Sequence, residues 1–188
     1  MTRSEALDLL LNKPYKLGHL LGFTKLTKMH NDWIIDMVRG TEDKTLQAHR
    51  GSYKTTCVSI AIAILVIVLP RKKIMFMRKT DADTKEIVLQ VRKILESPYV
   101  QAIVRALYGV DLKLVTATYT NITTSLNYEP RGTAQLSAMG VNGSLTGKHF
   151  DIIFTDDIVN VEDRISKAER EHTKLVYQEL QNIKNRDL

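Results

Sequence analysis

The feature that most constrains the fold is an apolar run, Cys57–Leu69, that holds no charged side chain. A membrane-spanning helix needs about 20 apolar residues, and this run is shorter. A helix that is apolar on every side has to be covered by other elements, so the run predicts a buried helix of a folded domain. The chain has 188 residues, of which 44% are apolar, and this is ample for one core.

From Lys44 onward, short apolar segments alternate with longer segments whose apolar residues recur every three or four positions. This alternation is typical of an α/β domain in which helices flank a largely parallel sheet. We expect strands at residues 45–48, 73–77, 112–119, 121–128, 134–139 and 150–155. The last of these strands, Phe150–Thr155, is expected to be the most strongly buried of the second half.

Helices are expected in the stretches that carry capping groups and amphipathic spacing. They lie at residues 4–11 and 31–38, in the run through Leu69, after Thr80, at 100–107 and over 161–188. The helix after Thr80 has its apolar face at Ile87, Val88, Val91, Ile94 and Leu95. The final helix has Ile165, Ala168, Leu175, Val176, Leu180 and Ile183 available as an inward face.

Residues 1–43 are expected to form a basic helical lead-in, and residues 44–188 the core domain. The net charge is +6, and the basic excess lies in the first 80 residues. Lysines 13, 16, 25 and 28 stand between the helical pieces of the lead-in. They form either a solvated surface or a nucleic-acid contact, and composition does not separate these two interpretations.

The single cysteine, Cys57, excludes an internal disulfide and a zinc site made of several thiolates. It is typical of a reduced, intracellular protein. The N-terminus shows no export signal, and no membrane partner is expected. The five histidines lack metal-ligand spacing, so we expect surface or capping roles for them. Phe23 and Trp33 are expected to pack in the core rather than to stack on a base.

Residues 47–56 stand between a predicted strand and the apolar helix, which is the context of a phosphate-binding loop. In such a loop, backbone N–H groups and the helix N-terminus face an anion, Lys54 reaches the terminal phosphates and Thr55 binds Mg²⁺. The match to G-x-x-x-x-G-K-[ST] is incomplete, because Ala48 and Tyr53 occupy the glycine positions. With a tyrosine at the second position, either the backbone takes angles that a residue with a Cβ atom can adopt or the loop is bent differently, because only glycine visits the left-handed regions cheaply. The expected ATP-binding residues are His49, Arg50, Gly51, Ser52, Tyr53, Lys54, Thr55 and Thr56.

A pair of acids, Asp156 and Asp157, follows the strand Phe150–Thr155. One carboxylate there can hold Mg²⁺ and the second can orient or deprotonate water. Alone, the pair could cap a following helix, and the loop could be a basic turn. Their joint occurrence in this order favours a nucleotide site.

Three blocks, residues 50–56, 143–157 and 162–164, carry a resemblance to a known family. They resemble the N-terminal ATPase domain of the large terminase subunit of tailed bacteriophages, and the likeness covers about residues 44–175. The family's loop reads R-G-x-x-K-T, and its paired acids follow a glycine-rich turn that contains H-F-D. The resemblance implies a RecA-like fold of the ASCE P-loop class.

The resemblance also implies a function, which is ATP-driven transport of double-stranded DNA into a procapsid. Implied partners are the portal protein, the small terminase subunit and further copies in a ring, in the cytoplasm of the infected host. Carried over by position, Lys54 contacts the β- and γ-phosphates, Thr55 and Asp156 hold Mg²⁺, Asp157 is the catalytic acid and Arg50 contacts the γ-phosphate.

The sequence departs from the family at two points. The usual catalytic acid is glutamate, so Asp157 is one methylene shorter, and Glu162 is the available substitute. The family continues beyond the match with a coupling motif and a nuclease domain, so we expect a truncated ATPase domain with weak activity and no nuclease site.

Two alternatives remain open at this point. One is another RecA-like nucleic-acid ATPase, such as a helicase. The other is a non-catalytic domain that binds DNA or a protein partner and whose phosphate loop has decayed.

Overall fold

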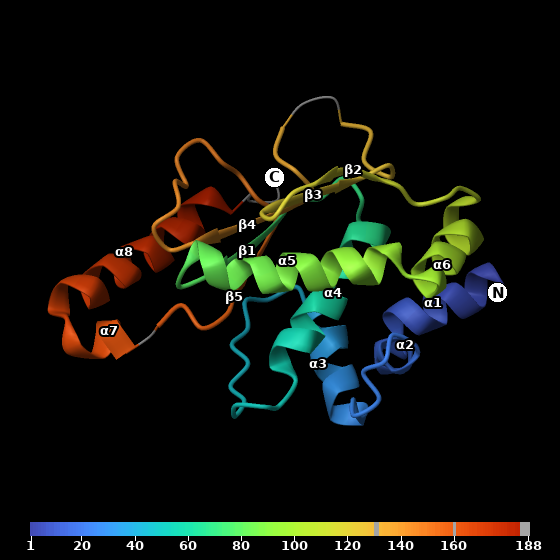
Figure 1. The fold of residues 1–188 in the computed structure, drawn as a ribbon, viewed down its shortest axis with the longest axis horizontal. Coiled ribbons are helices and arrows are strands. Elements are labelled where there is room, and N and C mark those ends of the chain that lie inside the picture. Colours follow the sequence, from blue (N-terminus) through green and yellow to red (C-terminus); the bar gives the residue numbers. More distant parts are fainter. Residues whose placement is uncertain (130–131, 160, 185–188) are drawn as a thin grey trace. The chain divides into compact units, whose positions relative to one another are not determined.

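The computed structural model describes residues 1–129, 132–159 and 161–184. Figure 1 shows its helices and its single five-stranded sheet. The helices are α1 (Arg3–Leu11), α2 (Pro14–Leu20), α3 (Lys28–Arg39), α4 (Lys54–Val68), α5 (Asp81–Glu96), α6 (Pro98–Tyr108), α7 (Val161–Ile165) and α8 (Lys167–Ile183). The strands are β1 (Ile74–Arg78), β2 (Leu114–Ala117), β3 (Asn121–Thr124), β4 (Leu136–Gly140) and β5 (Ile152–Thr155).

The chain forms two compact units. The helical unit comprises Met1–Pro70 and Gln90–Lys113, and the sheet unit comprises Arg71–Leu89 and Leu114–Leu188. Helix α5 therefore begins in the sheet unit and ends in the helical unit.

The core of the helical unit is α4, as the apolar run predicts. Every residue from Cys57 to Ile67 is buried. Ser59 is fully buried, and its hydroxyl donates a hydrogen bond to the Gln90 side chain at 2.6 Å. At the other end of α4, the Tyr108 hydroxyl donates to the Ile67 carbonyl at 2.6 Å. Among the described residues, no helix is both long and apolar enough to cross a membrane.

The lead-in helices differ from the prediction at Pro14. The first helix ends before this residue, as expected, but Pro14 itself begins α2. Proline is tolerated at the first position of a helix because the N–H group it lacks has no intrahelical partner there. The predicted helix at residues 31–38 is part of the longer α3.

The sheet has the strand order β2-β3-β4-β1-β5. Strand β1 pairs in parallel with β4 and β5, whereas β3 is antiparallel to β2 and β4. Four strands thus run in one direction, and the α/β class with a mostly parallel sheet is confirmed. The predicted strand at residues 45–48 is wrong, because this segment is irregular and largely exposed.

The expected helix after Thr80 is confirmed as α5. The Thr80 hydroxyl accepts the Asp83 N–H at 3.2 Å, which caps the helix start. All five predicted apolar positions of α5 are buried: Ile87, Val88, Val91, Ile94 and Leu95.

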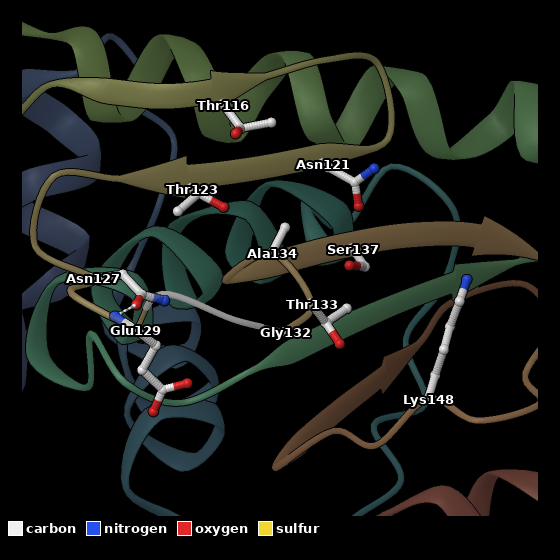
Figure 2. A pocket seen from close by; sticks show the side chains of 10 residues that line it. All are labelled: Thr116, Asn121, Thr123, Asn127, Glu129, Gly132, Thr133, Ala134, Ser137 and Lys148. Carbon is white, nitrogen blue, oxygen red and sulfur yellow. Dashed lines mark hydrogen bonds between the residues drawn. The ribbon is translucent and has the colours of Figure 1, made fainter.

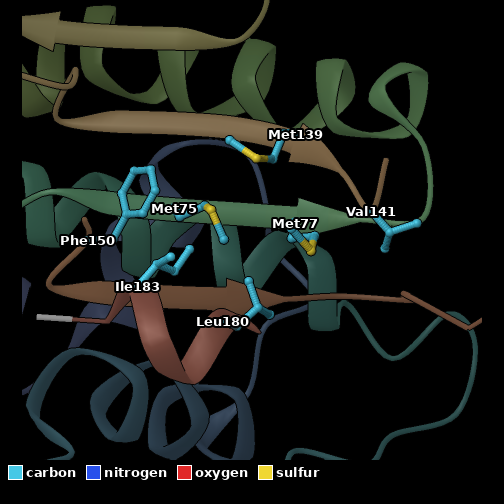
Figure 3. Close-up of a cluster of buried hydrophobic side chains, with 7 residues drawn as sticks. All are labelled: Met75, Met77, Met139, Val141, Phe150, Leu180 and Ile183. Atoms are coloured by element: carbon cyan, nitrogen blue, oxygen red, sulfur yellow. The ribbon is translucent and has the colours of Figure 1, made fainter. Parts of the chain in front are cut away.

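The C-terminal end of helix α8 packs against one face of the sheet (Figure 3). Three methionines of β1 and β4 pack there with Phe150 and with two residues of α8; the cluster is Met75, Met77, Met139, Val141, Phe150, Leu180 and Ile183. Strand β5 is half-buried rather than strongly buried, because it lies at the sheet edge and pairs only with β1 among the described strands.

The predicted final helix is divided in two. Ser166 ends the first part and caps α8, since its hydroxyl accepts the Glu169 N–H at 3.3 Å. This break changes which side chains point inward. Leu180 and Ile183 are buried as predicted, but Ile165 and Leu175 are 81% and 60% exposed. Ala168 is also exposed, Val176 is partly buried, and residues 185–188 of the predicted helix lie outside the described part.

Candidate functional site

The segment before α4 forms a tight turn with two left-handed residues. Gly51 has φ 77° and Tyr53 has φ 58° and ψ 19°. The Ser52 N–H donates to the His49 carbonyl at 3.3 Å, which closes the turn. This differs from the expectation for a residue with a Cβ atom: Tyr53 adopts the left-handed backbone that the glycine of the loop pattern would adopt, at a cost that glycine would avoid.

The turn delivers Lys54 and Thr55 to the first two positions of α4. No side chain caps this helix start, and its first turn contains no acid. The Ser52 hydroxyl is buried, with 6% of the residue exposed, and has no hydrogen-bond partner among the described residues. A positively polarised helix end next to an unsatisfied hydroxyl suits an anionic ligand.

Helix α3 holds the turn through one side chain, His30. Its Nδ1 accepts the Thr27 N–H at 2.9 Å, and its Nε2 lies 3.0 Å from the Ser52 carbonyl oxygen. The imidazole ring also meets the rings of Trp33 and Tyr53 edge-on, with centroids 5.1 and 6.0 Å away. Of the expected surface or capping roles, His30 has the capping one, and the residue is buried.

The paired acids follow β5 in the sheet unit. Asp156 is 4% exposed, and Asp157 is exposed with φ 47°. The Arg78 guanidinium, at the end of β1, donates to Asp156 Oδ2 from Nη2 at 2.9 Å and from Nε at 3.3 Å. Sequence reasoning missed Arg78, since 78 residues separate the pair and the parallel pairing of β1 with β5 brings them together.

The block at residues 162–164 contributes a structural carboxylate. Asp163 is buried, and its Oδ1 accepts from Lys79 Nζ at 3.0 Å and from the Thr173 hydroxyl at 2.6 Å. Glu169 lies 3.4 Å from the same ammonium group. Glu162, the predicted substitute for the catalytic acid, is exposed in the short helix α7.

The residues of the predicted nucleotide site therefore belong to two different units. The loop with Lys54 belongs to the helical unit, and Asp156 and Asp157 belong to the sheet unit. That these parts face each other across one triphosphate stays a prediction. Within the described ranges, no group of three or more His, Cys, Asp or Glu side chains could hold a metal ion. Mg²⁺ does not need one, because it commonly takes one or two carboxylates together with water and phosphate oxygens.

A polar hollow lies elsewhere on the sheet unit and holds none of the predicted site residues. Side chains of β2, β3 and β4 line it together with Lys148, as Figure 2 shows. Its wall includes the Ser137 hydroxyl, which is buried without a partner in the described part of the chain. The hydroxyl and amide side chains there are typical of the solvent-exposed face of an antiparallel hairpin.

Comparison with known proteins identifies the family. A search of curated proteins finds no match. A family model described as "Terminase large subunit, T4likevirus-type, N-terminal" matches residues 39–171, which is more than half of the chain. The matched range contains both the turn before α4 and the paired acids after β5. The chain therefore belongs to the family of the N-terminal region of large terminase subunits, components of the motor that packages bacteriophage DNA.

Proposed function

We propose that this chain is the ATPase module of a viral DNA-packaging motor, with a RecA-like core that couples ATP hydrolysis to the movement of double-stranded DNA into a procapsid. The observation that carries the proposal is the left-handed turn at Gly51 and Tyr53, which leads into an uncapped helix beginning Lys54-Thr55. Family membership adds the expectation of DNA packaging.

The loop binds the triphosphate. Lys54 contacts the β- and γ-phosphates, and the turn supplies N–H donors beside it. Arg50, which is exposed, contacts the γ-phosphate, where a planar guanidinium can donate two parallel hydrogen bonds. The unpartnered Ser52 hydroxyl gains an acceptor when an anion occupies the loop.

Thr55 and Asp156 hold Mg²⁺, since a hydroxyl and a carboxylate are the oxygen ligands that this ion takes beside phosphate. When bound, Mg²⁺ would supply positive charge that offsets the negative charge of the phosphate oxygens. Asp157 orients the attacking water and accepts its proton; as the exposed member of the pair it is open to solvent. Arg78 holds the Asp156 carboxylate in place by two hydrogen bonds.

The test is equilibrium binding of ATP with and without Mg²⁺. Lys54→Ala is expected to weaken binding by at least tenfold, because the variant loses a charge-assisted contact worth about 1.5–3 kcal/mol. Lys44→Ala is the matched control, since Lys44 lies shortly before the loop and pairs with Asp36 at 2.8 Å. Equal binding by both variants would contradict the proposal and favour a domain without a nucleotide site.

Hydrolysis assays separate a packaging motor from a helicase. Duplex DNA is expected to stimulate turnover more than single-stranded DNA does. The isolated chain should hydrolyse ATP slowly, because an arginine from a neighbouring subunit can raise such rates by about 10³–10⁵. The portal protein, the small subunit and a ring of copies are the proposed partners. Brisk turnover by a monomer without DNA would contradict this part of the proposal.

A further inference from the structure

We infer that His30 is a positioning residue for the phosphate loop: it sets the direction of the peptide bond between Ser52 and Tyr53. The inference deepens the proposed function and depends on it for its consequence, the binding of phosphate. Its geometric part depends only on the contacts of His30, Thr27 and Ser52.

The hydrogen bonds of His30 assign a different role to each ring nitrogen. The Thr27 N–H donates to Nδ1 at 2.9 Å, so Nδ1 is an acceptor. The proton of the neutral ring is then on Nε2, which donates to the Ser52 carbonyl at 3.0 Å. The first contact belongs to the start of α3, and the second joins α3 to the loop 22 residues further along the chain.

The contact with Ser52 determines where the next N–H group points. The described chain has no cis peptide bonds, and in a planar trans peptide the C=O and the following N–H point in opposite directions. With its carbonyl held by His30, Ser52 directs the Tyr53 N–H away from the histidine. Among the described residues, no group accepts the Tyr53 N–H, whereas the Ser52 N–H donates to the His49 carbonyl.

Ring contacts support the same arrangement. Tyr53 occupies the second glycine position of the loop pattern and has a left-handed backbone. Neighbouring groups must therefore hold its side chain in one position. The His30 ring meets the rings of both Trp33 and Tyr53 edge-on. One histidine thus holds both the carbonyl before Tyr53 and the ring of Tyr53, while the backbone N–H stays available to an anion.

Two amide substitutions separate the two hydrogen bonds. Asparagine places its amide near the position of Nδ1, so His30→Asn keeps the cap on Thr27 and loses the contact with Ser52. Glutamine reaches the position of Nε2, so His30→Gln keeps the contact with Ser52 and loses the cap. His19→Gln is the control, because His19 makes a similar contact through Nε2 to the Leu26 carbonyl at 2.6 Å and packs edge-on against Tyr15.

The first measurement is ATP affinity of the full chain with Mg²⁺, beside the melting temperature. We expect His30→Asn to bind ATP about tenfold more weakly than the wild type, with His30→Gln and His19→Gln within about threefold. The melting temperature should rank the variants in a different order. His30→Gln loses the cap of α3 and should melt at a lower temperature than His30→Asn, which keeps the cap. Wild-type affinity in His30→Asn, or losses of affinity that follow the melting temperature, would overturn the inference.

The second measurement needs no nucleotide. The Ser52 and Cys57 amides donate to the His49 and Tyr53 carbonyls, so their hydrogen exchange reports the shape of the loop. Exchange should accelerate several-fold in His30→Asn and stay near wild type in the other two variants. If the wild type fails to bind ATP, the proposed function fails, and this comparison still decides the role of His30: unchanged exchange in His30→Asn refutes it.

Discussion

Replacing Lys79 with methionine removes one partner of a buried ion pair in the sheet unit. Lys79 is 6% exposed and Asp163 is 2% exposed, and their charged atoms lie 3.0 Å apart. In Lys79→Met the Asp163 carboxylate stays buried and keeps the Thr173 hydroxyl as a donor. The variant therefore contains a buried carboxylate that has lost the Lys79 ammonium group.

The expected loss of stability is large. Removing one partner of a buried pair costs about 3–5 kcal/mol, and the remaining Thr173 hydrogen bond favours the lower end. A loss of about 3 kcal/mol is a large share of the roughly 5–15 kcal/mol that typical domains possess. With a urea m-value of about 2 kcal/mol/M, the unfolding midpoint should fall by about 1.5 M.

The assay is urea unfolding followed by circular dichroism, with two comparison variants. Arg92→Met removes an exposed pair with Glu96 and should cost at most about 0.5 kcal/mol. Lys79→Met combined with Asp163→Leu removes both charges and should recover most of the loss. If Lys79→Met costs no more than Arg92→Met, or if the double variant is less stable than the single one, the reasoning is refuted.

The difference in stability between the wild type and Lys79→Met depends on pH with a definite sign. Burial alone would lower the pKa of Lys79, but hydrogen bonds to Asp163 and Glu169 outweigh it and raise the pKa above its ordinary value. Stability from a raised lysine pKa is fully present below the unfolded pKa of about 10.4 and is lost as the pH rises through the folded pKa. The difference between wild type and Lys79→Met should stay constant from about pH 7 to 10 and shrink above that range.

Two further predictions concern the start of α4. Tyr53→Val should lower the free energy of unfolding by about 1–2 kcal/mol while Tyr53→Gly does not, because a β-branched residue fits the left-handed region poorly; equal urea midpoints for the two variants would contradict this. Burial raises the pKa of the Cys57 thiol to about 12, so the native protein at pH 8 should not react with a disulfide reagent, whereas urea-unfolded protein should react at once. Rapid labelling of native protein at pH 8 would show that α4 is not enclosed.

Features that depend on neighbouring residues could be predicted from the sequence. The buried helix α4, the cap and apolar face of α5, and the strand before the paired acids all follow from local patterns. Each of these depends on spacing along the chain, which the periodicity of helices and strands makes readable.

Three features that differ from the predicted elements also have local signals in the sequence. The predicted strands at 112–119 and 121–128 are separated by a single residue. So short a connection can join only the antiparallel strands of a hairpin, and β2 and β3 are antiparallel. Ser166, a good helix cap, interrupts the predicted final helix and turns Ile165 outward. Pro14 begins the unpredicted helix α2, since proline suits the first position of a helix.

The sequence by itself determined the α/β class, the family's motifs and the chemical types of residue available for a nucleotide site. Only the tertiary structure decided which polar groups are paired: His30 with Ser52, Arg78 with Asp156, and Lys79 with Asp163, over separations of 22, 78 and 84 residues. The physical reason is that a buried charge or carbonyl must find a partner, but strand pairing and helix packing, not spacing along the chain, determine which partner comes within 3 Å.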